Sequence, residues 1–300
     1  MKDILVRASV ENYGVAAPNV GHEIDARAVI EAAEELNAPL ILDVAFISTP
    51  DMVFYGKYLT ELAKMSSVPI AINLDHGSNF AQPILAIRAG FTSIMVDRST
   101  LPYEENVKEV FELCRIAHSV GVSVEAELGH VGWGDNYVID GKSALTDPEQ
   151  AKEYIERTGI DCLAVAIGTA HGAYKGTPYI DFDRLDEIKK AVGPDFPLVL
   201  HGGSGSGDDN LAKACTLGIN KINIYNDICK ASYEALVEAK LTGNGVYGMW
   251  NVAQEGMKLR IAELIEKFGG KGKAWVPRIV GISGNVSIKQ ADAATGEQTV

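Results

Sequence analysis

Short apolar runs alternate along the chain with longer segments in which apolar residues recur at helical spacing. Eight of these runs are rich in residues that favour strands, as is typical of strands buried in a parallel sheet. They cover residues 13–20, 38–46, 68–75, 91–97, 121–129, 159–168, 196–203 and 218–225. Amphipathic stretches such as 22–37 and 102–120 lie between the runs and predict helices.

Strands that alternate with helices are the pattern of parallel βαβ units. Eight units favour a (β/α)8 TIM barrel over an open doubly wound sheet, and no GxGxxG motif follows the first run to support dinucleotide binding. We expect one domain over residues 1–300, with extra C-terminal helices at about 231–280 and a polar tail at about 281–300.

The charge, the cysteines and the apolar segments of the chain exclude several classes of protein and indicate a cellular compartment. A net charge of −13 argues against a general affinity for nucleic acid or an anionic membrane, so we expect neither partner. The four cysteines form neither a CxxC pair nor a disulfide framework, which suits a reducing compartment. With no signal-peptide core and no membrane-spanning run, the sequence predicts a cytoplasmic protein.

Three histidines stand where the expected strands end. His76 ends the third strand, His171 follows the sixth and His201 ends the seventh. Catalytic groups of a TIM barrel collect at the C-terminal ends of its strands, and a catalytic zinc takes three protein ligands and keeps one open position. The alternative for each residue is a core histidine bonded to the backbone.

Three carboxylates, like the histidines, lie at the ends of expected strands. Asp75 precedes a proposed metal ligand, where it can orient the site or act as a general acid/base; the alternative is a cap on the following turn. Asp97 and Glu127 end the fourth and fifth strands. They can support the ligands or form an alternate metal position, and a purely structural role stays open.

Two segments after the last strands predict anion binding. "HGGSGSGDDN" begins at His201, and "NIYND" begins at Asn223. Loops after strands seven and eight of such barrels often bind phosphate through backbone N–H groups, and glycine permits the close approach. A metal and a phosphate in one barrel mouth indicate a phosphorylated sugar or a similar small anion.

These segments resemble the class II, zinc-dependent ketose-bisphosphate aldolases, the group that contains the fructose- and tagatose-bisphosphate enzymes. The resemblance runs in family order over roughly residues 10–280, through "LDHGS", "SIMVDRS", "GVSVEAELG", "DCLAVAIGTAHGAYKG", "PLVLHGGSG" and "INKINI". It implies that His76, His171 and His201 ligate a catalytic Zn²⁺ and that Asp75 is the catalytic aspartate. Asp97 and Glu127 match residues that can hold a second metal or an alternate zinc.

The resemblance also implies a substrate site and partners. Asn223 matches an asparagine at the carbonyl end of the substrate. The expected substrate- and phosphate-binding set is Asn19, Gly172, Gly202, Gly203, Ser204, Asn223, Tyr225 and Asn226. Family members often bind Na⁺ or K⁺ near the phosphate, and they are commonly homodimers or homotetramers.

The implied activity is reversible retro-aldol cleavage of a ketose 1-phosphate or 1,6-bisphosphate to dihydroxyacetone phosphate and an aldehyde, a lyase reaction of carbohydrate metabolism such as glycolysis. Zinc would act as a Lewis acid for the enediolate, while Asp75 exchanges the C4 hydroxyl proton. The family uses a loop glutamate to protonate the enediolate carbon, and Asp135 aligns with that position.

Departures from the family pattern cluster at substrate-facing loops. Tyr225 and Asn226 replace the usual Asp/Ala–Thr pair, Arg98 stands where glycine is usual, and the loop after the second strand is longer. In the family a basic residue from a neighbouring subunit usually meets the distal phosphate; Lys258 or Arg260 are the candidates here, with a solvated helix face as the alternative. The aldehyde is therefore inferred to differ from glyceraldehyde 3-phosphate, and the C4 stereochemistry stays open.

Three other functions remain open. The first is the same chemistry on a deoxy or keto-acid sugar phosphate. The second is a metal hydrolase, against which stands the lack of an HxH pair after the first strand. The third is a non-catalytic sugar-phosphate-binding homologue, against which stand Asp75 and the three histidines.

Overall fold

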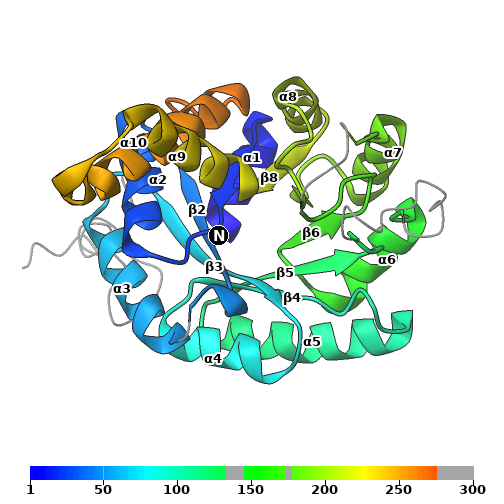
Figure 1. Cartoon of the computed structure of the whole chain (residues 1–300). Helices are drawn as coiled ribbons and strands as arrows, with labels where there is room; N and C mark the ends of the chain where they lie inside the picture. The colour runs from blue at the N-terminus through cyan, green and yellow to red at the C-terminus, as the bar shows by residue number, and fades with distance from the viewer. Residues whose placement is uncertain (50, 133–144, 173–177, 276–300) are drawn as a thin grey trace, which may run out of the picture.

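A ring of parallel strands forms the centre of the protein (Figure 1), in a computed structural model that describes residues 1–49, 51–132, 145–172 and 178–275. The described strands are β1 (Val15–Pro18), β2 (Leu40–Ala45), β3 (Ile70–Gly77), β4 (Ser93–Val96), β5 (Ser123–Leu128), β6 (Cys162–Val165), β7 (Leu198–Leu200) and β8 (Ile219–Ile224). They pair in parallel in the order β1-β8-β7-β6-β5-β4-β3-β2. A parallel bridge between Asn19 and Asp43 joins the two ends of this order and closes the barrel.

Each strand is followed by a helix on the outside of the barrel, as Figure 1 shows. These helices are α2 (Glu23–Glu35), α3 (Met52–Met65), α4 (Ala81–Ala89), α5 (Tyr103–Ser119), α6 (Pro148–Thr158), α7 (Phe182–Val192), α8 (Asp208–Thr216) and α9 (Asn226–Ala239). A short 3₁₀ turn, η1 (Phe46–Ser48), precedes α3. The predicted (β/α)8 TIM barrel is confirmed.

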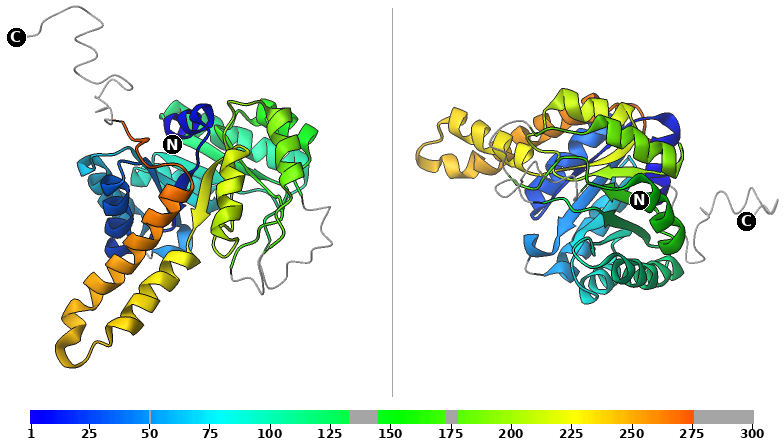
Figure 2. Two further views of the ribbon diagram at one scale, coloured as in Figure 1. Left: turned by 90° about the horizontal axis from the view of Figure 1, so that it is seen from above. Right: turned by 90° about the vertical axis from the view of Figure 1, so that its right-hand side faces the viewer.

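Extra helices are attached at both ends of this unit. After the 3₁₀ turn η3 (Gly243–Gly245), the chain reverses into α10 (Val246–Lys267), and α9 and α10 form a hairpin that projects from the barrel (Figure 2). The prediction of C-terminal helices is confirmed for these residues, and the predicted polar tail lies outside the described ones. None of the described helices is long and apolar enough to span a membrane.

A helix that the sequence patterns did not predict, α1 (Lys2–Glu11), precedes the first strand. Its buried residues join a cluster formed by inward-facing strand residues at one end of the barrel. Members of this cluster include Met1, Ile4, Leu5, Ala8, Val15, Ala17, Ile41, Ala71, Met95, Ala164 and Val199. The helix therefore completes the core inside the strands, while the larger cluster lies between the strands and the outer helices.

Candidate active site

The three predicted histidines meet at one end of the barrel. His76 lies at the end of β3, His201 directly follows β7, and His171 lies between β6 and α7. Their ring centroids are 4.7 Å apart for His76 and His201, 4.8 Å for His76 and His171, and 5.7 Å for His171 and His201. His201 Nδ1 lies 3.0 Å from His76 Nε2, so two imidazole nitrogens face a shared space.

Carboxylates hold the outer nitrogens of two of these rings. Glu125 Oε1 lies 2.8 Å from His201 Nε2, and Asp97 Oδ2 lies 2.8 Å from His76 Nδ1. Histidines that ligate metals usually donate their second N–H to such a partner, which fixes the tautomer and the ring orientation. In each pair the other nitrogen is left to face the centre of the cluster.

The backbone at His76 is in the left-handed region, with φ of 52°, and the strand register shifts between Leu74 and Gly77. Arg98 supports this irregular segment from behind: its Nη1 donates to the carbonyl of Gly77 at 2.8 Å and to that of Asp97 at 2.6 Å. Only 3% of Arg98 is exposed. The arginine is therefore a buried brace for the segments that carry His76 and Asp97 rather than a group at the barrel mouth. Its Nε forms an ion pair with Oε2 of Glu109, a partly exposed residue of α5.

Asp75 lies beside this cluster and is held from two sides. Asn19 Nδ2 donates to its Oδ2 at 2.7 Å, and Asn223 Nδ2 donates to its Oδ1 at 3.1 Å. Burial by itself would raise the pKa of Asp75, but nearby positive charge, chiefly on His76, holds it below its usual value. The side chain is thus an oriented carboxylate that faces the histidines.

The donor set fits a divalent metal. Two overlapping groups, one of His76, His171 and His201 and one of His76, Asp97 and Glu127, have ligand atoms within 4.8 Å of one another. Glu127 is 1% exposed, and its Oε2 is a buried oxygen without a hydrogen-bond partner. Burial would lower the pKa of His76, but the surrounding carboxylates raise it to about 10, so the local potential favours positive charge.

The predicted phosphate residues lie together after β7 and β8. Ser204 Oγ accepts hydrogen bonds from the backbone N–H of Tyr225 at 3.0 Å and of Asp227 at 3.2 Å, where α9 begins. A Cβ at Gly202 would lie 2.2 Å from the carbonyl oxygen of Ala170, and its φ is 65°, so glycine is required. Backbone N–H groups at a helix N-terminus favour an anion here.

The remaining predicted residues are placed as follows. Gly203 donates its N–H to the Asn223 carbonyl, and Gly172, with φ of 87°, is the last described residue before 178. Asn226 is the first residue of α9. Asp135 lies outside the described residues.

The two distal-phosphate candidates are engaged in ion pairs within the chain. Arg260 Nη2 lies 2.6 Å from Asp208 Oδ1 at the start of α8 and 3.2 Å from Asp227 Oδ2 in the first turn of α9. Lys258 Nζ lies 2.7 Å from Glu35 Oε1 at the end of α2. Arg260 is thus brought to the beginnings of the helices beside the phosphate loops, whereas Lys258 pairs with a different part of the fold.

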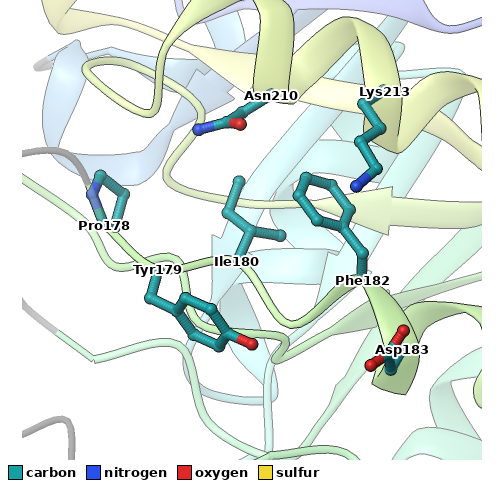
Figure 3. Close-up of a pocket in the computed structure, with 7 residues that line it drawn as sticks. All are labelled: Pro178, Tyr179, Ile180, Phe182, Asp183, Asn210 and Lys213. Carbon is teal, nitrogen blue, oxygen red and sulfur yellow. The ribbon is translucent and has the colours of Figure 1, made fainter.

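A separate concavity of about 310 Å³ opens between the start of α7 and α8 (Figure 3). Pro178, Tyr179, Ile180, Phe182, Asp183, Asn210 and Lys213 line it. Lys213 Nζ lies 3.9 Å from the centre of the Phe182 ring, so the ring contacts the cation directly. None of the predicted site residues lines this concavity, and we assign it no catalytic role.

Several buried polar residues of the site were not predicted from the sequence. Glu125 in β5 and Lys221 in β8 are fully buried and lie 3.0 Å apart, and Asp43 in β2 and Asn73 in β3 join them. The available signal was the occurrence of charged residues within otherwise apolar runs. Such residues are rare inside a core unless they are paired.

Comparisons with known proteins agree with this geometry. A family model described as "Fructose-bisphosphate aldolase class-II" matches residues 1–273. The chain is 40% identical to a fructose-bisphosphate aldolase of Thermus caldophilus and 38% identical to one of Geobacillus stearothermophilus, each over 91% of this chain and 98% of that protein.

Among solved structures, the YdjI aldolase of Escherichia coli K12 is similar with a TM-score of 0.81 and 33% identity, over 91% of this chain and 98% of that chain. Fructose-bisphosphate aldolase of Campylobacter jejuni is also similar, with a TM-score of 0.77 and 26% identity, over 90% of this chain and 94% of that chain. The chain belongs to the class II fructose-bisphosphate aldolase family.

Proposed function

We propose that this protein is a metal-dependent aldolase that reversibly cleaves a ketose 1-phosphate or 1,6-bisphosphate, of fructose or tagatose type, into dihydroxyacetone phosphate and an aldehyde. The observation that carries the proposal is the convergence of His76, His171 and His201 beside the oriented carboxylate of Asp75. Membership of the class II family supports the reaction class.

Class II chemistry uses a divalent metal, and we propose zinc because three imidazoles are a typical donor set for that ion. His76, His171 and His201 would hold it. Bound there, the metal supplies a Lewis acid that stabilises negative charge developing on substrate oxygens. Asp97 and Glu127, together with His76, offer a second or alternate metal position.

Asp75 would exchange the proton of the C4 hydroxyl. The hydrogen bonds from Asn19 and Asn223 fix both of its oxygens, so its orientation is set before substrate arrives. The Asn223 amide would donate to the charge that develops at the carbonyl end of the substrate. Asp135 stays our proposal, from the sequence, for the acid that protonates the enediolate carbon.

The substrate phosphate would bind to the segments after β6, β7 and β8. The proposed set is Gly172, Gly202, Gly203, Ser204, Tyr225 and Asn226. The N–H groups of Gly203 and Tyr225 are bonded within the chain, to the Asn223 carbonyl and to Ser204 Oγ, so these two residues would shape the loops while the others would provide backbone donors. The start of α9 and the close backbone approach at Gly202 support this assignment. A monovalent cation, Na⁺ or K⁺, beside the phosphate is part of the same proposal, as is a role for Lys258 or Arg260 at the distal phosphate.

We further propose a homodimer or homotetramer in the cytoplasm. The hairpin of α9 and α10 projects from the barrel (Figure 2) and supports the assembly. It exposes large apolar side chains, among them Tyr233, Tyr247 and Trp250. Large apolar side chains that gather on an exposed surface often mark a contact with another protein. The free thiols of Cys114, Cys162 and Cys215 are buried and support a reducing compartment.

The assembly gives a direct prediction. Tyr247 is 84% exposed, and replacing it by aspartate should place a charge in the subunit contact and reduce the mass measured by analytical ultracentrifugation to that of a smaller species. Tyr179 is also exposed but lines the concavity beside α7 rather than the hairpin, so it provides the matched control, and Tyr179→Asp should leave the mass unchanged. A Tyr247→Asp variant with the wild-type mass would contradict a contact through the hairpin.

The reaction is tested by hydrogen exchange into dihydroxyacetone phosphate. The protein should exchange a carbon-bound proton of this compound with deuterated solvent, should lose this activity with a chelator, and should regain it with Zn²⁺. A hydrolase would instead release inorganic phosphate, and a non-catalytic binder would do neither. Condensation with a panel of aldehydes then identifies the aldehyde half and the C4 stereochemistry.

A further inference from the structure

A lysine lies in the middle of the barrel, beneath the candidate active site. Lys221 is in β8 and is 0% exposed. Its Nζ donates to Asn223 Oδ1 at 2.7 Å and lies 3.0 Å from both Asp43 Oδ2 and Glu125 Oε2. The ammonium thus donates a hydrogen bond to the Asn223 amide and forms ion pairs with two carboxylates.

The stability of the fold alone does not explain a buried ion cluster around Lys221. Taking charges out of water is costly, and apolar residues of similar volume are often as stabilising as a buried ion pair. Here one ammonium faces the carboxylates of Asp43 and Glu125 in the core. The contacts that Lys221 makes toward the site therefore matter more than its contribution to packing.

The first of these contacts orients an amide. Lys221 Nζ donates a hydrogen bond to the side-chain oxygen of Asn223, Oδ1. The side-chain N–H₂ group is therefore the end of the amide that faces the site. That end donates to Asp75 Oδ1 at 3.1 Å and lies 3.5 Å from His201 Nδ1. Without the lysine, the Asn223 oxygen loses its charged donor, and the amide is free to rotate away from the carboxylate it now holds.

The second contact orients an imidazole through a carboxylate. Glu125 binds Lys221 with Oε2 and His201 with Oε1, at 3.0 Å and 2.8 Å. This arrangement places the other ring nitrogen, Nδ1, 3.0 Å from His76 Nε2 at the centre of the histidine cluster. The contact of Lys221 with Oε2 therefore holds the Glu125 side chain in the position from which Oε1 meets the His201 ring.

We propose that Lys221 is a positioning residue that sets two functional groups at once: the Asn223 amide directly, and the His201 imidazole through Glu125. The inference rests on the proposed function. It predicts two separable losses when the lysine is replaced, one in the turnover of metal-loaded enzyme and one in metal affinity.

The test uses Lys221→Met, which keeps an unbranched side chain of nearly the same length and removes the charged amino group. We expect the zinc dissociation constant, measured by competition with a chelator, to rise by about 10–100-fold, the range typical when a partner of a metal-ligating residue is lost. At saturating zinc, we expect kcat for cleavage to fall by a similar factor while KM changes little. Asp43→Asn, which also alters the ion cluster but contacts neither Asn223 nor His201, is the matched control and should change both quantities much less.

Double variants separate positioning from a general structural effect. In an Asn223→Ala background, Lys221→Met should no longer lower kcat, and in a Glu125→Gln background it should no longer weaken zinc binding. Undiminished losses in both backgrounds, or no loss in the single variant, would overturn the proposal. If Lys221→Met does not fold, Lys221→Met combined with Asp43→Asn removes the excess buried charge and carries the same two measurements.

Failure of this inference is distinguishable from failure of the proposed function. If the wild-type protein neither exchanges the carbon-bound proton of dihydroxyacetone phosphate nor cleaves a ketose phosphate, the proposed reaction is wrong. The zinc dissociation constants would still report whether Lys221 supports His201 through Glu125.

Discussion

Replacing His171 by alanine should deprive the protein of tightly bound metal and nearly abolish retro-aldol cleavage. His171 is one of three imidazoles whose ligand atoms lie within 4.8 Å of one another, and a catalytic zinc site relies on all three. Loss of a Lewis acid that contributes roughly 4 kcal/mol corresponds to a fall in kcat of about 10³-fold. The ring is only partly buried, so the truncation leaves the core intact.

The measurement is metal content by mass spectrometry together with the steady-state rate of cleavage. His118→Ala is a suitable control because His118 lies on α5, away from the cluster, with its Nε2 2.8 Å from Asp161. That variant should keep its metal and its activity. A His171→Ala protein that retained one equivalent of metal and wild-type kcat would show that the ion is held elsewhere.

The second large effect is expected from Asp75→Asn, which preserves the shape of the side chain but removes its ability to accept a proton. Positioned general bases contribute about 10²–10⁴-fold, so cleavage of the ketose phosphate should fall by that factor. Exchange of the carbon-bound proton of dihydroxyacetone phosphate should be far less affected, because that compound lacks the C4 hydroxyl on which Asp75 is proposed to act.

The two rates are measured on the same preparation, with zinc content as the check on metal binding. Asp97→Asn, which alters the carboxylate that contacts His76 at 2.8 Å, serves as the comparison because it should affect both rates through the metal. An equal fall of cleavage and exchange in Asp75→Asn would assign Asp75 to the support of the cluster rather than to proton transfer at the hydroxyl.

Much of the barrel was predictable because each strand is buried on both faces and reads as one apolar run. Seven of the eight expected strands contain the observed ones. The third does not, because an irregular register lets the pairing of β3 continue past His76 to Gly77, two residues beyond the expected end at 75. Helix α1 was missed because its buried residues pack under the barrel, a tertiary contact that leaves only a modest pattern in ten residues.

The three histidines were predictable because the ends of parallel strands meet at one edge. Their hydrogen-bond partners were not, since the contact of His201 with Glu125 depends on which residues of β5 point inward. The positions of Arg98 and Arg260 depend on contacts between residues far apart in the sequence: Arg98 contacts Gly77, and Arg260 contacts Asp208. No local pattern carries that information.

The most direct test of the shared metal centre is anomalous scattering at the zinc edge from crystals of the zinc-loaded protein. The account predicts one peak with nitrogen ligands from His76, His171 and His201 at about 2.0–2.1 Å, beside the carboxylate of Asp75. A zinc peak remote from these rings, or rings that turn away from a common point, would contradict it.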